Sequence, residues 1–146
     1  MTQDNFWDTN ADGREDEVGF LTVRVTTAGG AIPLERAIVN VRGSDVSDSS
    51  VIYALTTNSD GLTRTVSLPA PPRSASTVPQ DLTPPYAVYN IDVYAEGYIP
   101  ALFNNVPIFS GVNSVQGAVL VPMLEGENNN RIRVVNEIQY PGGEAQ

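Results

Sequence analysis

Apolar and polar residues alternate along several short segments of this chain, as they do in β-strands with one buried face. Leu21, Val23 and Val25 share one face of the first segment. The later segments span residues 38–41, 51–57, 62–68, 89–93, 102–109 and 115–121. Pro107 cannot donate to a strand ladder, so we expect a sheet edge or a bulge in the sixth segment. No window has a convincing helical period, and the pattern therefore predicts an all-β fold.

Turn residues separate these segments. Asn58-Ser59-Asp60-Gly61 combines side chains that cap their own backbone with a glycine that accepts positive φ, and it predicts a hairpin between residues 51–57 and 62–68. Further turn signals occur at Gly29-Gly30, Gly97 and Gly111. Short strands with regularly recurring turns are typical of a β-sandwich.

Three stretches carry a resemblance to a known family: GFLTVRVTTAGGAIPLERAIVNVRG from Gly19, TTNSDGLTRTVSLP from Thr56 and YNIDVYAEGYIP from Tyr89. They resemble the carboxypeptidase regulatory-like domain, a transthyretin-like (prealbumin-like) sandwich of seven or eight strands. The residues that match the family pattern in order are Pro33, Ala37, Thr57, Gly61, Leu68, Pro69, Gly97 and Tyr98. The likeness covers about residues 20–122, and it implies a seven- to eight-stranded all-β sandwich.

The chain departs from the family at two places. Arg36 stands where the family usually has glycine, and the proline-rich insertion at residues 71–85 is longer than the family's short link. The chain is most similar to versions of the domain in clostridial cell-wall and spore-cortex proteins, where segments like Asn105–Phe109 also occur. That narrower resemblance implies a site of action outside the cell or on a cell or spore surface.

The chain is expected to hold one folded domain with an extension at each end. Its 146 residues suffice for a single core. We expect an acidic extension at residues 1–18, the sandwich at residues 19–124 and a second extension at residues 125–146. No segment approaches the roughly 20 apolar residues of a membrane helix. Met1 is followed by TQDNFWDTN rather than a basic and then apolar leader, so we expect no membrane insertion and an export signal that is absent or already removed.

The C-terminal extension contains one further alternating segment. Its apolar face comprises Ile132, Val134, Ile138 and Tyr140, with Asn136 among them. One interpretation is an additional edge strand or a packed tail of the same chain. The other is a strand that pairs with a neighbouring copy, since exposed sheet edges accept such strands. Phe6 and Trp7, the apolar residues of the N-terminal extension, are the other candidates for assembly contacts.

The N-terminal extension also contains a candidate calcium loop. Oxygen ligands at positions 1, 3 and 5, glycine at 6 and a carbonyl at 7 are the pattern with which EF-hand-like loops bind Ca²⁺. Those places and position 9 are filled by Asp8, Asn10, Asp12, Gly13, the Arg14 carbonyl and Asp16. The loop is closer to dockerin and thrombospondin-type repeats than to an EF-hand, because position 12 is Gly19. The alternative is an acidic linker that binds nothing.

Composition excludes most catalytic chemistry. The chain has no His and no Cys, and all 8 basic residues are arginine. Triads, thiolate or Schiff-base nucleophiles and histidine metal centres are therefore impossible. A carboxylate pair remains, but Asp92 alone stands out in a strand, where we expect a solvated outward face. The net charge of −9 disfavours nucleic acid. We expect a protein that is not an enzyme.

Aromatic residues offer a carbohydrate-binding interpretation. Tyr86, Tyr89, Tyr94 and Tyr98 lie close together in the sequence, and aromatic rings stack on sugars. Because Tyr94 is opposite in parity to Tyr89, the rings do not share one face, and core packing is the better prediction. The proline-rich insertion is expected to be a semi-rigid surface loop.

Together these patterns predict a structural module that self-associates into an extracellular, cell-surface or spore-associated fibre or layer through exchange of a terminal strand. We expect a homo-oligomer or polymer, with Ca²⁺ ordering the N-terminal extension if its loop binds. The alternatives are an accessory or pro-region module of a spore-cortex or peptidoglycan lytic system, and a cell-wall glycan-binding module.

Overall fold

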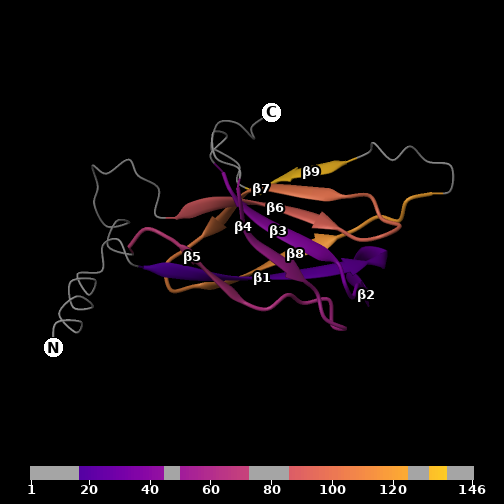
Figure 1. The fold of residues 1–146 in the computed structure, drawn as a ribbon, viewed down its shortest axis with the longest axis horizontal. Helices are drawn as coiled ribbons and strands as arrows, with labels where there is room; N and C mark the ends of the chain where they lie inside the picture. Colours follow the sequence, from indigo (N-terminus) through magenta and orange to yellow (C-terminus); the bar gives the residue numbers. More distant parts are fainter. Residues whose placement is uncertain (1–16, 45–49, 73–85, 125–131, 138–146) are drawn as a thin grey trace.

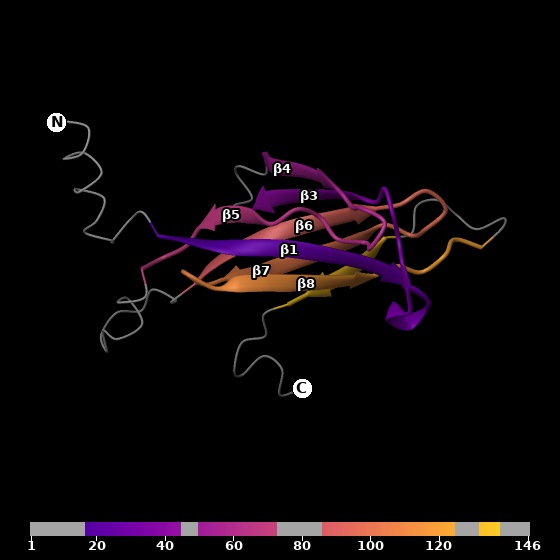
Figure 2. The same cartoon turned by 90° about the horizontal axis from the view of Figure 1, so that it is seen from below.

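The computed structural model describes residues 17–44, 50–72, 86–124 and 132–137. These residues form two β-sheets that lie as two layers (Figures 1 and 2). Their one helical element is the 3-10 turn η1 (Ala28–Gly30), so the predicted all-β sandwich is confirmed. None of the described segments is a helix long and apolar enough to cross a membrane.

The first sheet is built around β1 (Val18–Thr27). On one side β1 pairs antiparallel with β5 (Val66–Pro69) and, near its C-terminal end, with β2 (Ile32–Pro33). On the other side it pairs with β8 (Asn113–Val119) in a parallel ladder. The alternation along the sequence identifies β1 and β8 as strands, but it does not reveal that they run in the same direction.

The second sheet contains five strands in the order β4-β3-β6-β7-β9. Their bounds are Val51–Thr56, Ile38–Gly43, Ala87–Tyr94, Ala101–Ile108 and Arg133–Asn136 respectively. All neighbours are antiparallel except β7 and β9, which are parallel. The register between β6 and β7 shifts near Tyr89, and Pro107 lies beyond the part of β7 that β9 covers, in keeping with the predicted bulge or edge.

The core lies between the two sheets and is made of the inward-facing residues of each strand. Alternate positions of β1 and β3 are fully buried, as period-two patterning requires. The largest fully buried side chains are Leu21, Val23, Val25, Val39, Val41, Leu68, Ile91, Val93, Ile108 and Leu120. Burial of this apolar set is the main force that holds the sheets together.

The predicted hairpin is wrong, although its turn is present. The Gly61 N–H donates to the Asn58 carbonyl at 2.9 Å, and Gly61 has φ +77°, as the turn requires. The strands on either side then diverge, because β4 pairs with β3 in the second sheet and β5 pairs with β1 in the first. Residues 57–65 therefore cross from one sheet to the other instead of closing a hairpin.

Thr57 and Gly61 hold this crossover. Thr57 is buried, and its hydroxyl accepts from the Ala37 N–H at 2.9 Å and donates to the Leu34 carbonyl at 2.6 Å. A Cβ at Gly61 would lie 2.5 Å from the Val25 carbonyl oxygen, so the backbone of the crossing chain can approach β1 only with glycine there. Thr57 and Gly61 therefore have a structural role, because they hold the crossover between the two sheets.

Arg36 adopts a backbone conformation that suits glycine better. Its φ is +67°, in the left-handed region, and its N–H donates to the Thr57 carbonyl at 3.0 Å. A residue with a Cβ costs about 1–2 kcal/mol in this region. The glycine that the resembling family usually carries here would relieve that strain.

Candidate assembly surface at the β8–β9 edge

β9 is attached to the edge of the second sheet and contributes little to the core. Its residues pair with Ala101–Asn104 of β7, and Val134 lies opposite Leu102. Val135 is the β9 residue that packs against the core, whereas Val134 and the preceding Ile132 are each 55% exposed. The apolar face predicted for this segment is thus real in its described part, but it points to solvent.

Backbone hydrogen bonds fix β9 at both ends. The Arg133 N–H donates to the Pro100 carbonyl and the Glu137 N–H donates to the Asn104 carbonyl, each at 2.9 Å. β9 therefore docks on β7 mainly through main-chain pairing, which any chain of the same sequence can supply.

Side chains of β9 also reach the first sheet. The Leu120 N–H donates to the Thr26 carbonyl of β1. The Val119 carbonyl of the same peptide group therefore points away from β1, toward the open side of β8. There the Val119 carbonyl accepts from Nη1 of Arg133 at 2.8 Å. Farther along, Nε2 of Gln116 donates to Oε2 of Glu137 at 3.0 Å. These two contacts close one side of the sandwich between β8 and β9.

The opposite side of the sandwich is also closed by a contact between two edge strands. The Tyr53 hydroxyl on β4 donates to the Ser67 carbonyl on β5 at 2.8 Å, and the Arg64 guanidinium lies 5.6 Å from the centre of the Tyr53 ring. This side thus carries a direct bond from one edge strand to the other.

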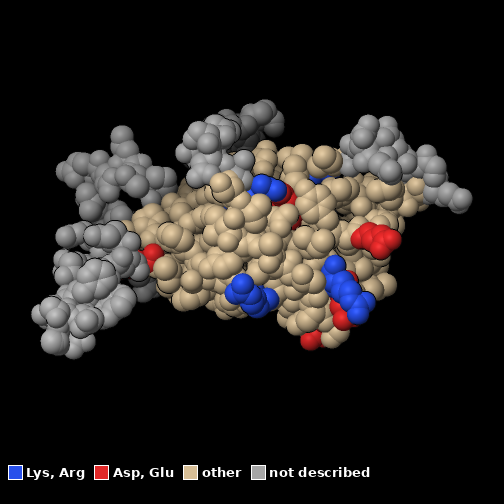
Figure 3. All heavy atoms as spheres, viewed as in Figure 1, with Lys and Arg blue, Asp and Glu red and all other residues tan. Residues whose placement is uncertain are grey.

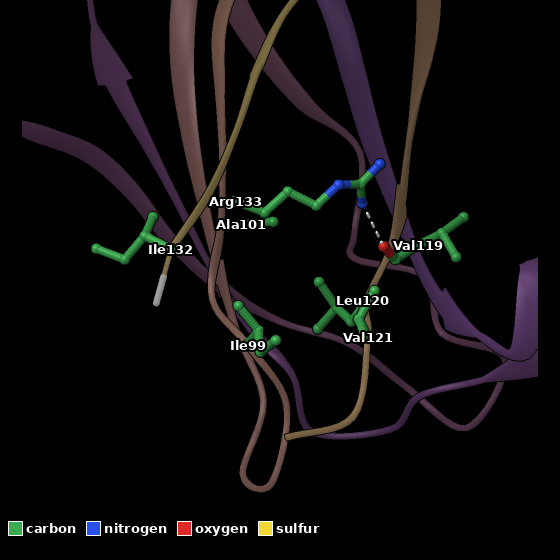
Figure 4. A pocket seen from close by; sticks show the side chains of 7 residues that line it. All are labelled: Ile99, Ala101, Val119, Leu120, Val121, Ile132 and Arg133. Carbon is green, nitrogen blue, oxygen red and sulfur yellow. Dashed lines mark hydrogen bonds between the residues drawn. The ribbon is translucent and has the colours of Figure 1, made fainter. Parts of the chain in front are cut away.

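A pocket of about 280 Å³ opens where β8 ends and where β7 and β9 begin (Figure 4). Its lining comprises Ile99, Ala101, Val119, Leu120, Val121, Ile132 and Arg133. Figure 4 shows the Arg133 side chain extending from β9 toward the Val119 carbonyl, with Ile99, Leu120 and Val121 below it. The pocket is therefore apolar, with a single cation at its boundary.

Three of the apolar residues that line the pocket are also exposed to solvent. Val119, Val121 and Ile132 are 38%, 46% and 55% exposed respectively. The sequence reveals Ile132 and Val134 as candidates, but the contribution of Val119 and Val121 depends on the non-local approach of β8 to β9.

Charge is distributed unevenly between the described and the remaining residues. The described ranges contain six of the 17 acidic residues and five of the 8 arginines. These are Glu17, Glu35, Asp60, Asp92, Glu96 and Glu137 against Arg24, Arg36, Arg42, Arg64 and Arg133. The described sandwich is thus nearly neutral, and Figure 3 shows only scattered charges on the face it draws. Most of the net charge of −9 belongs to the other segments of the sequence.

Most of the predicted site residues lie outside the described residues. This holds for the calcium-loop residues Asp8, Asn10, Asp12, Arg14 and Asp16, and for the assembly candidates Phe6, Trp7, Ile138 and Tyr140. Within the described ranges, no group of three or more His, Cys, Asp or Glu side chains could hold a metal ion.

Asp92 does not have the solvated position that we expected. It is 8% exposed, and its Oδ2 lies 2.6 Å from Nε of Arg42 on the neighbouring strand. The prediction is wrong because Asp92 lies on β6, a central strand, where adjacent side chains cover the outer face of the sheet. Its carboxylate is held in an ion pair.

The tyrosines do not form a common platform. Tyr89 is 8% exposed, and its hydroxyl donates to the Pro69 carbonyl of the other sheet at 2.5 Å. Burial raises the pKa of this hydroxyl above its ordinary value. Tyr98 packs against the core, and Tyr86 contacts Phe109 with ring centres 5.3 Å apart. Tyr94 is partly exposed on the opposite face from Tyr89, so core packing of Tyr89 and Tyr98 is confirmed.

No protein-family model and no curated protein matches the chain. Among solved structures, catechol 1,2-dioxygenase from Acinetobacter radioresistens is similar at a TM-score of 0.53 and 13% identity, covering 88% of this chain and 59% of the dioxygenase. The Bacillus anthracis TIE protein is similar at a TM-score of 0.48 and 15% identity, covering 73% of this chain and 17% of that protein. At such identity the first likeness shows a shared fold alone, and the second is too weak to carry an argument.

Proposed function

We propose that this chain is a non-enzymatic structural module that self-associates, as a subunit of a fibre or layer outside the cell or on a cell or spore surface. Copies join by exchange of β9, which pairs with β7 of a neighbour in place of β7 of its own chain. The observation that carries the proposal is the construction of β9, the last strand among the described residues. It is held mainly by main-chain bonds, Val135 packs on the core, and Val134 and the preceding Ile132 are exposed.

Such a strand suits exchange for a physical reason. Its contacts are the same whether it comes from its own chain or from another copy, so exchange costs little beyond the entropy of association. Strand addition at a sheet edge supplies affinity through backbone bonds and selectivity through alternate side chains. Here Val135 is the inward side chain that would select the register.

The absence of catalysis is supported by the side-chain inventory. The sequence has no His, Cys or Lys. In the described part of the chain, Asp92 is paired with Arg42, and no group of three or more acidic side chains could hold a metal ion.

In this proposal, Ca²⁺ stabilises the N-terminal segment. Binding by Asp8, Asn10, Asp12 and Asp16 would neutralise a concentrated negative charge and hold that segment for contact with a neighbour. A chelator should then weaken association of the native chain without altering the fold of the sandwich.

Exchange can be tested with engineered cysteines, because the natural chain has none. Val134 and Leu102 are paired residues on β9 and β7, close enough for a disulfide. One preparation carries Leu102→Cys and the other carries Val134→Cys. When the two are mixed and oxidised, exchange of β9 predicts a covalent dimer that contains one chain of each.

The matched control pairs Val134→Cys with Ile38→Cys, since Ile38 is also exposed on the second sheet but does not contact β9. This mixture should show only background cross-linking. If both mixtures cross-link to the same small extent, β9 stays in its own chain and the exchange mechanism is wrong.

A further inference from the structure

We infer that the pocket at the β8–β9 edge receives Trp7 from a neighbouring copy of the chain. This inference rests on the proposed self-association and adds a second contact to it. The occupant is the segment Asp4-Asn5-Phe6-Trp7-Asp8.

The size and lining of the pocket suit one large side chain. Its volume of about 280 Å³ lies below the range of about 300–1,000 Å³ that is usual for small-molecule sites. Six of the seven lining residues are aliphatic, and three of these, Val119, Val121 and Ile132, are partly exposed at its boundary. An aromatic anchor buries about 150–250 Å² in such a setting, and Trp is enriched among anchors that dominate association.

Charge favours the N-terminal segment as the source of that anchor. Arg133 is the one charged side chain among the seven that line the pocket. Trp7 is the one Trp of the chain, and Asp8 follows it directly. A guanidinium that gives one N–H to Val119 still has donors for a carboxylate, and it can also lie over an indole ring.

The chain is long enough for either the same copy or a neighbouring copy to supply Trp7. The pocket lies beside the C-terminal end of β1, where Thr26 is paired with Val119. From Val18 to Thr26 the strand covers about 26 Å, at roughly 3.3 Å per residue. The residues between Trp7 and Val18 span at most about 40 Å when fully extended. The segment can reach its own pocket at about two-thirds of full extension, so chain length does not choose between the two copies. We assign the neighbouring copy because of the proposed self-association.

Because Trp7 is the single Trp, its fluorescence reports its surroundings in the full chain. We expect its emission to shift to shorter wavelength, and acrylamide quenching to fall, as protein concentration rises and the mass measured by sedimentation increases. Trp7→Ala should weaken association about thirtyfold, the loss typical of a Trp anchor.

A variant that places a negative charge at the boundary of the pocket tests the binding of the acidic segment specifically. Val121→Glu should place a carboxylate against the acidic segment. The repulsion should weaken association by about tenfold or more and abolish the emission shift. The control is Val115→Glu, on the preceding edge strand β8 but outside the lining, with Val115 at 63% exposure. It should leave both the shift and the mass unchanged.

Three results would overturn the inference. An emission shift that does not depend on concentration would put Trp7 in its own chain. Increasing mass with Trp7 accessible to acrylamide at every concentration would reject the pocket but leave the proposed self-association standing. A constant mass of one chain would reject both.

Discussion

Replacing Thr57 with valine tests the crossover that joins the two sheets. Thr57 is 4% exposed, and its hydroxyl accepts from the Ala37 N–H at 2.9 Å while it donates to the Leu34 carbonyl at 2.6 Å. Valine has nearly the same shape but makes neither bond. The Ala37 N–H would lose this partner at a residue that is 0% exposed.

The size of the effect follows from these two bonds. An unsatisfied buried donor costs about 1–3 kcal/mol, and loss of a typical hydrogen bond costs about 0.5–1.5 kcal/mol. The additional buried methyl group of valine offsets about 0.8 kcal/mol of this loss in stability. Thr57→Val should therefore lower the free energy of unfolding by about 2 kcal/mol, which corresponds to a fall in Tm of roughly 5–10 °C.

Urea unfolding at low protein concentration, followed by far-UV circular dichroism, measures this difference. Thr57→Ser keeps the hydroxyl and should lose about 1 kcal/mol. The control is Thr56→Val at the adjacent exposed residue of β4, which should stay within about 0.5 kcal/mol of the natural chain. If Thr57→Val is as stable as Thr56→Val, the crossover does not depend on the hydroxyl and the reasoning is wrong.

Three further changes test the backbone and the core by the same unfolding assay. Gly61→Ala places a Cβ 2.5 Å from the Val25 carbonyl and should cost more than about 2 kcal/mol, so a loss below 0.5 or so would refute the close approach. Arg36→Gly relieves a φ of +67° at some cost in unfolded-state entropy and should raise stability by about 0.5–1 kcal/mol, whereas a loss would show that the arginine side chain matters more. Tyr89→Phe removes the hydroxyl bond to the Pro69 carbonyl and should cost about 1 kcal/mol at neutral pH. Because burial raises the pKa of Tyr89 in the folded state, the neutral hydroxyl stabilises the fold below a pH of about 10, and this stability is lost as pH rises through the folded pKa. Tyr89→Phe should therefore lose less stability at alkaline pH than the natural chain, and an equal loss would contradict this.

The sequence predicts the strands well because each is defined by a local period of two. The alternation around Leu21, Val23 and Val25 coincides with the inward face of β1. Pairing is not local, and there the predictions fail. The turn at Gly61 looks like a hairpin turn in sequence, yet its flanking strands pair in different sheets. β2 (Ile32–Pro33) is too short to produce a detectable pattern.

The candidate site is predictable only in part for the same reason. The exposed face of β9 follows from the alternation of Ile132 and Val134. The pocket requires in addition that Val119 and Val121, about a dozen residues earlier, lie beside Arg133, and no local pattern encodes that approach. Asp92 illustrates the same limit, because its burial depends on the strands that flank β6.

Sedimentation of the full chain over a wide range of concentration, with and without Ca²⁺, tests the central claim most directly. A self-associating module predicts a mass that increases in multiples of 15.7 kDa as concentration rises, and a smaller increase when a chelator is present. A mass of 15.7 kDa at every concentration, in the presence of Ca²⁺, would contradict the account.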